Sequence, residues 1–181
     1  PSAIRKKGVQ EEPSQATTLE LAFRPPYDWE AIMGFLAART VGGVEEVGEA
    51  GYRRTIRLMA KGTPHAGWLC IARGTKGNAL RVTLSAELLP VLPAVLTRVA
   101  RFMDLACDPL AVSEGLGGLA DGHEGVRLPG AMDGFEVAVR AILGQQVTVA
   151  GARTLAGRFA AAFGDSLATP FPLLTTIFPS P

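Results

Sequence analysis

Residues 127–164 read RLPGAMDGFEVAVRAILGQQVTVAGARTLAGRFAAAFG. This stretch predicts two helices that meet at an abrupt corner, Gly144-Gln145-Gln146. Asp133 stands where the first helix should begin, because Glu136 follows three residues later as in an acidic capping box and an apolar series comes next.

The second helix should begin at Thr148, since apolar and small residues then recur at spacings of three and four. It should end at Gly164, whose freedom to adopt a positive φ suits a helix stop.

Upstream, the pattern changes from strands to helices. Alternating residues from Leu19 to Phe23 predict a strand, and Asp28 should cap a helix over residues 29–39. Further strands are predicted at 44–47, 52–59, 68–73 and 79–84, the last two joined by a turn at 74–78. One helix beside several short strands indicates an antiparallel sheet and an α+β fold.

After Ser85 the chain becomes helical. Helices are predicted at 86–105 and 109–116, and Pro93 should break or restart the first of them. A glycine-rich connector is expected at 117–130, and residues 165–181 should be extended.

Three regions follow from these patterns. Residues 1–16 are polar and lack apolar periodicity, which indicates a tail or linker. Residues 17–88 should form a small α+β domain, and 89–181 should begin an all-helical domain.

Composition excludes several classes of protein. With 48% hydrophobic and 19% charged residues the chain should fold, and no apolar run approaches the roughly 20 residues that cross a bilayer. No signal peptide is visible, so we expect an intracellular protein with Cys70 and Cys107 as buried thiols rather than a disulfide. His65 and His123 are isolated, so no metal site is predicted.

Net charge is only +1, but residues 51–81 contain seven basic and no acidic side chains. Such a segment could attract phosphates, and it is equally typical of the solvated face of a sheet.

The quoted stretch resembles the core of the DNA-3-methyladenine glycosylase II family, within the helix-hairpin-helix superfamily. Resemblance extends through LAFRPPYDWEAIMGFLAARTVGGVEEV, RVTLSAELLPVL and RVARFMDLACDPLAV, in the family's order and over about nine-tenths of the chain. The opening PSAIRKK resembles the end of a helix-turn-helix regulator domain, which is fused ahead of this glycosylase in some alkylation-repair proteins. The family excises alkylated bases such as 3-methyladenine from double-stranded DNA, without an organic cofactor.

The resemblance places a duplex-filling side chain at Gln146, where the familiar occupant is an apolar wedge, and Gln145 at the groove or pocket edge. Spacing alone favours two ordinary polar residues in a turn between helices. By the same resemblance Phe35 supplies an aromatic surface for the extruded base, and Arg39 approaches the same pocket. Without the resemblance, the sequence favours Phe35 as a core aromatic and Arg39 as an exposed arginine at a helix end. Trp29 and Trp68 are expected in the core.

The family's hairpin and catalytic aspartate lie beyond the matched segment, so no catalytic residue is expected among the 181 residues and the chain alone should be inactive. Asp133 and Asp108 are better explained as helix caps.

Three alternatives remain open. One is a DNA-binding or damage-sensing module of a fused regulator, another is an enzyme for oxidised bases, and the third is a fragment that does not fold stably. For the complete enzyme, the resemblance implies a monomer in the bacterial cytoplasm or nucleoid.

Overall fold

The computed structural model describes residues 16–75 and 77–181. The tail predicted over residues 1–16 therefore lies outside the described residues, except for Ala16, which begins the first strand. The regulator-like PSAIRKK also lies outside them.

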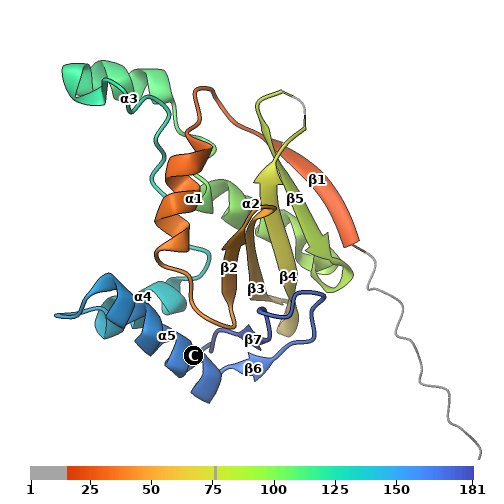
Figure 1. The fold of residues 1–181 in the computed structure, drawn as a ribbon. Coiled ribbons are helices and arrows are strands. Elements are labelled where there is room, and N and C mark those ends of the chain that lie inside the picture. The colour runs from red at the N-terminus through yellow and green to blue at the C-terminus, as the bar shows by residue number, and fades with distance from the viewer. Residues whose placement is uncertain (1–15, 76) are drawn as a thin grey trace, which may run out of the picture.

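Five antiparallel strands form the sheet that dominates the described residues (Figure 1). Their order is β1-β5-β4-β3-β2. The strands are β1 (Ala16–Ala22), β2 (Glu45–Gly48), β3 (Gly51–Ala60), β4 (Thr63–Arg73) and β5 (Ala79–Ser85). All five were predicted, and with the helices they confirm the α+β class.

β4 begins five residues earlier than predicted, at Thr63 rather than Trp68. Lys61 and Gly62 both have positive φ, 49° and 80°, which is the backbone of a tight turn whose twist suits a hairpin. The turn pairs Ala60 with Thr63 and extends the ladder. Residues 63–67, TPHAG, lack the alternation that would have revealed this part of the strand.

Two helices pack with the sheet in one hydrophobic cluster. α1 (Trp29–Ala37) is capped as predicted, since the Asp28 side chain accepts the Ala31 N–H at 2.9 Å. α2 (Leu92–Phe102) begins at the predicted restart, with Pro93 in its first turn. The preceding residues form a 3-10 helix, η1 (Ala86–Val91), instead of the continuous helix predicted over 86–105.

The remaining helices follow in chain order and include the predicted pair. They are α3 (Pro109–Leu116), the short 3-10 helix η2 (Gly117–Ala120), α4 (Gly134–Leu143) and α5 (Val149–Phe163). A second, smaller cluster joins α5 to the loop before β2, through Val41, Val44, Ala156, Ala160 and Phe178. The division at residues 88 and 89 stays a prediction, and the larger cluster extends across it from the sheet into α2.

Gly164 ends α5 for a different reason from the one predicted. Its φ is −82°, so no left-handed conformation is needed. A Cβ at this position would lie 2.3 Å from the carbonyl oxygen of Ile177 and 2.5 Å from that of Ala160. Glycine is therefore required by the close approach of two backbone segments.

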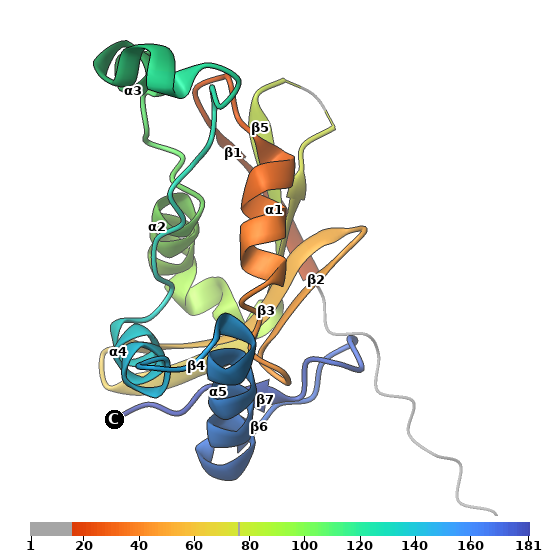
Figure 2. The same ribbon diagram turned by 60° about the vertical axis from the view of Figure 1, so that its left-hand side comes forward.

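The segment after α5 is not simply extended. It forms a small hairpin of β6 (Asp165–Ser166) and β7 (Thr176–Ile177) that packs against the sheet domain (Figure 2). The Thr55 hydroxyl donates to the Thr176 carbonyl oxygen at 2.6 Å, and Phe171 meets Trp68 edge to face at 5.1 Å between ring centroids.

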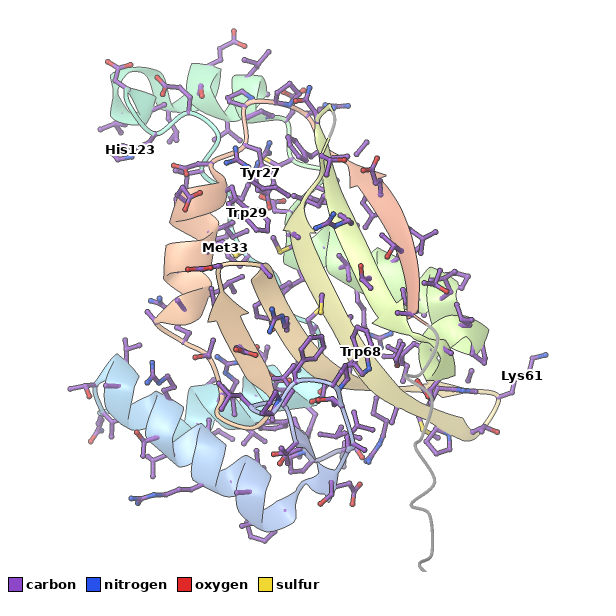
Figure 3. All side chains as sticks on the ribbon, turned by 45° about the vertical axis from the view of Figure 1, so that its right-hand side comes forward. Tyr27, Trp29, Met33, Lys61, Trp68 and His123 are labelled. Atoms are coloured by element: carbon purple, nitrogen blue, oxygen red, sulfur yellow. The ribbon has the colours of Figure 1, made fainter. Side chains whose placement is uncertain are left out.

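Four residues were predicted to be buried, two tryptophans and two cysteines. Trp29 and Trp68 are buried as expected, and Figure 3 labels both. Cys70 and Cys107 are free thiols, as predicted, but half-buried rather than buried. Within the described ranges, no helix is both long and apolar enough to cross a membrane.

Candidate functional site

The corner between α4 and α5 is an exposed feature of the structure. The Asp133 side chain accepts the Glu136 N–H at 2.8 Å, and Thr148 accepts the Gly151 N–H at 3.1 Å, so both predicted caps are confirmed. These caps define where the helices begin, and Gln145 and Gln146 lie exposed in the connection between them. A side chain here has open access to a large partner.

Gln146 adopts a backbone conformation that is unusual for its residue type. Its φ is 59°, in the left-handed region where glycine and asparagine are more common. A long side chain in this region carries a backbone cost, and such outliers concentrate at functional positions. The corner was predicted, but this conformation was not.

Phe35 lies on α1 and is not a core residue, so its interpretation as a buried aromatic under the sheet is wrong. Its side chain is 41% exposed, although Ile32 and Leu36 on the same helix are buried. The Arg39 guanidinium lies over the Phe35 ring, with Cζ 3.7 Å from the ring centroid. Arg39 also donates from Nη1 to the Phe35 carbonyl oxygen at 3.1 Å.

Two hollows connect these features. The first, which we call the aromatic hollow, has a volume of 380 Å³ and lies between α1, α4 and the connector before α4. Its lining includes Phe35, Arg39, Phe102, Pro129, Val137 and Arg140. The second, the corner hollow, has a volume of 210 Å³ and is lined by Arg140 of α4, residues of the corner and of α5, and Arg39. The structure thus brings Phe35 and Arg39 together, and Arg39 lies between the aromatic hollow and the corner.

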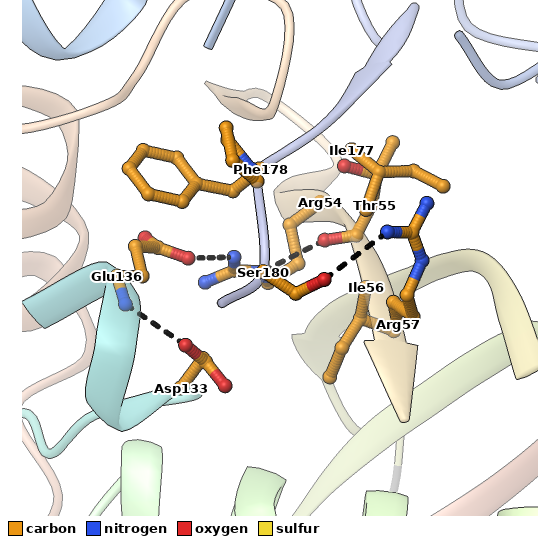
Figure 4. Close-up of a pocket in the computed structure, with 10 residues that line it drawn as sticks. Arg54, Thr55, Ile56, Arg57, Asp133, Glu136, Ile177, Phe178 and Ser180 are labelled. Atoms are coloured by element: carbon orange, nitrogen blue, oxygen red, sulfur yellow. Dashed lines mark hydrogen bonds and ion pairs between the residues drawn. The ribbon is translucent and has the colours of Figure 1, made fainter. Parts of the chain in front are cut away.

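An ion network, formed by the buried Glu45, Arg54 and Glu136 and the half-buried Arg140, attaches the corner helix to the sheet. Arg54 Nη2 lies 2.5 Å from Glu136 Oε2, and Figure 4 shows this pair beside the Asp133 cap. Arg140 Nη1 lies 2.9 Å from Glu136 Oε1 and 3.2 Å from Glu45 Oε2. Arg140 Nη2 also donates to the Arg39 carbonyl oxygen at 2.6 Å. The network therefore sets the position of α4 relative to α1.

Glu136 was interpreted only as half of a capping box, and its carboxylate instead binds Arg54 and Arg140. Two signals could have found the network. Glu136 and Arg140 are four residues apart on one helix, and the predicted hairpin would place Glu45 opposite Arg54, as the strand register does.

The network shifts the pKa of Glu136, one of its members, and of Tyr52, which contacts Glu45. Burial alone would raise the pKa of Glu136, but the charges and hydrogen bonds of Arg54, and then of Arg140, hold that pKa below its ordinary value. Burial, followed by the charge of Glu45, raises the pKa of Tyr52 well above its usual range. The Tyr52 hydroxyl accordingly donates to Glu45 Oε1, at 2.6 Å.

The basic segment 51–81 does not present one continuous charged surface. Four of its arginines pair with acids from other parts of the chain: Arg53 with Glu46, Arg54 with Glu45 and Glu136, Arg57 with Asp165, and Arg73 with Glu30. Arg54 is buried, so the segment is neither a simple phosphate-attracting patch nor simply the solvated face of a sheet. Lys76 lies outside the described residues.

Asp108 occupies a structural position. Asp108 caps α3 by accepting the Ala111 N–H at 3.3 Å, as predicted, and it also pairs with Arg24.

Glu45 is the carboxylate that borders the aromatic hollow, and both of its oxygens are already bound. Oε1 accepts from Tyr52 and Arg54, and Oε2 accepts from the Val41 N–H and from Arg140.

Comparisons with known proteins agree with this architecture. The AlkA N-terminal domain family matches residues 18–133. DNA-3-methyladenine glycosylase 2 of Escherichia coli (strain K12) is 41% identical over 147 residues, which are 81% of this chain and 51% of that protein. The probable bifunctional transcriptional activator/DNA repair enzyme AlkA of Mycobacterium tuberculosis (strain CDC 1551 / Oshkosh) is 34% identical over 191 residues, 99% of this chain and 37% of that protein.

The chain thus spans about half, or less, of the length of the curated relatives it matches. Among solved structures, the 3-methyladenine DNA-glycosylase from Archaeoglobus fulgidus superposes with a TM-score of 0.72 at 20% identity, over 90% of this chain and 56% of that one. This likeness shows a shared fold.

Proposed function

Because the chain belongs to the AlkA N-terminal domain family, we propose that it is part of a DNA glycosylase that flips out and hydrolytically excises alkylated bases such as 3-methyladenine. The observation that carries this proposal is the exposed corner bearing Gln146, next to a hollow with an aromatic wall.

Gln146 would fill the space that the extruded base leaves in the duplex. Enzymes that act on a base must remove it from the stack, and a side chain inserted at the gap offsets part of the lost stacking. The left-handed backbone at an exposed bend supports this role, because the residue stands clear of both helices. An amide can also hydrogen-bond to the base left without a partner. Gln145, exposed beside it, would lie at the edge of the groove.

The aromatic hollow would receive the extruded base. Its volume of 380 Å³ is within the range of about 300–1,000 Å³ that is common for small-molecule sites. Phe35 offers a ring face for stacking, and aromatic faces attract the electron-poor rings of alkylated purines. The hollow borders Arg39 and Arg140, which also line the corner hollow, so the two parts of the site adjoin.

The reactive carboxylate would come from a segment outside these 181 residues. Glu45 borders the hollow, but four donors occupy its two oxygens, so it is not available to stabilise a developing sugar cation. This chain would supply base extrusion and part of the base pocket, and double-stranded DNA with alkylated bases would be its partner.

The test uses the complete polypeptide that contains this chain. Gln146→Ala should weaken binding to a duplex with an abasic site and slow single-turnover excision of 3-methyladenine, because the gap is no longer filled. Phe35→Ala should weaken binding of the free base. Asn78→Ala, which removes an exposed amide from the β4–β5 turn at the other end of the molecule, is the matched control (Figure 1). Unchanged excision and abasic-site binding in Gln146→Ala would remove this residue from the proposed role.

A second candidate is a DNA-binding or damage-sensing module of a fused regulator. It is favoured by the match to the Mycobacterium tuberculosis protein, whose name includes transcriptional activation and which covers 99% of this chain. Excision of 3-methyladenine by the complete polypeptide would reject the non-catalytic version. Excision of 8-oxoguanine alone would instead favour an enzyme for oxidised bases.

A further inference from the structure

The face of Phe35 that would stack on a base is already covered by a planar cation. The Arg39 guanidinium carbon lies 3.7 Å from the ring centroid, which is stacking distance. A guanidinium is flat and spreads its charge over several atoms, as an alkylated purine cation does. Arg39 therefore occupies the ring face in the way that a bound base would.

Little else holds the Arg39 side chain in this position. Within residues 16–75 and 77–181 its guanidinium makes no ion pair, and its one hydrogen bond from Nη1 goes to the Phe35 carbonyl oxygen at 3.1 Å. Arg140, by contrast, forms ion pairs with Glu45 and Glu136. An exposed cation–π contact changes an equilibrium by only about two- to fivefold, so the Arg39 side chain can leave the ring at small cost.

The Arg39 backbone is held more firmly than its side chain. The Arg39 carbonyl oxygen accepts from Arg140 Nη2 at 2.6 Å, so the residue is anchored where α1 meets α4. From this anchor the side chain borders both hollows. A base that passes from the corner toward Phe35 would meet it first.

We propose that Arg39 is a gate on the base pocket, whose guanidinium covers Phe35 in the empty site, swings off when a base stacks, and returns as the base leaves. This inference rests on the proposed function, because it requires that Phe35 receive the base. It assigns Arg39 a positioning role in binding and release, with no part in bond cleavage.

The gate acts on every stacking base by the same factor. The apparent dissociation constant equals the intrinsic one divided by the fraction of molecules in which the ring face is open, so it rises when the open state is a minor population. Removing the guanidinium should therefore tighten binding of the free base about two- to fivefold and speed its association to a similar extent, because the ring face is then open at every encounter.

The experiment measures binding of free 3-methyladenine to the complete polypeptide by calorimetry, together with the NMR shifts of the Arg39 side-chain protons. In the free protein these protons should be shifted upfield by the Phe35 ring, and addition of the base should abolish that shift. Arg39→Ala should bind the base about two- to fivefold more tightly than the parent. Arg158→Ala is the matched control, because it removes an exposed arginine of α5 that lines neither hollow, and its affinity should not change.

Three results would overturn the gate. Weaker binding by Arg39→Ala would mean that the guanidinium and the base sandwich the ring. Equal binding would mean that Arg39 has no effect on base binding. An upfield shift of the Arg39 protons that persists with base bound would mean that the base does not displace Arg39 from Phe35. Phe35→Ala distinguishes failure of the gate from failure of the proposed function. If it leaves base affinity unchanged, the aromatic hollow is not the base pocket, whereas weaker binding combined with a failed Arg39 test rejects the gate alone.

Discussion

Arg54 on β3 and Glu136 on α4 are 82 residues apart in the chain, yet their side chains meet in a buried ion pair with Nη2 and Oε2 separated by 2.5 Å. Both residues are only 3–4% exposed. The pair connects the sheet to the helix that leads into the corner. Its geometry therefore bears on where Gln146 lies relative to Phe35.

Glu136→Gln should destabilise the protein by about 3 kcal/mol, because it leaves part of the Arg54 and Arg140 charge buried without a counter-ion. Urea unfolding at neutral pH measures this loss. Glu114→Gln is the control, since Glu114 is exposed on α3 and its loss should change stability by less than about 0.5 kcal/mol. Equal effects of the two substitutions would show that the buried pair contributes nothing specific.

Stability should fall in acid, with Glu136 as one named contributor. Burial opposes its ionisation, but Arg54 and then Arg140 hold its pKa below the ordinary value of 4.5. A carboxyl whose pKa is lower in the folded state stabilises the fold above the unfolded value, and this contribution is lost as pH falls through the folded pKa. Urea unfolding between pH 7 and pH 3 should therefore show a smaller acid-induced loss for Glu136→Gln than for the parent. Parallel curves would count against the assignment.

Gln146→Gly should raise stability by roughly 0.5 kcal/mol, since glycine adopts the observed φ of 59° without steric cost, and this relief outweighs the extra entropy that glycine loses on folding. The same change should weaken binding to a duplex with an abasic site. Gln145→Gly is the matched control, because residue 145 has no positive φ and should lose stability. A loss of equal size at both positions would mean that Gln146 is not strained.

Gly164→Ala should destabilise the protein by about 1–3 kcal/mol, because its Cβ would press on the backbone oxygens of Ile177 and Ala160. Gly157→Ala provides the contrast on the same helix. A Cβ there would lie 3.6 Å from its nearest neighbour, the Gly42 nitrogen, so the better helix propensity of alanine should raise stability by up to about 1 kcal/mol. Thermal unfolding of the two variants should shift in opposite directions, and shifts in the same direction would contradict this account.

Local chemistry made much of the fold predictable. Asp28, Asp108, Asp133 and Thr148 each cap a helix within a few residues of themselves, so short-range sequence reveals where those helices begin. The early start of β4 was missed because its first residues owe their pairing to the turn at Lys61 and Gly62 and not to apolar alternation.

For this protein, the sequence by itself determined the α+β class, the order of the five strands of the sheet and of the main helices, and the corner with its two amides, because each depends on caps and periodicities within a few residues. Only the tertiary structure decided that Glu136 meets Arg54, that Phe35 is exposed, and that Gly164 is a packing glycine. Those outcomes depend on which surfaces meet across the fold, and the residues that meet are separated by many positions in the chain.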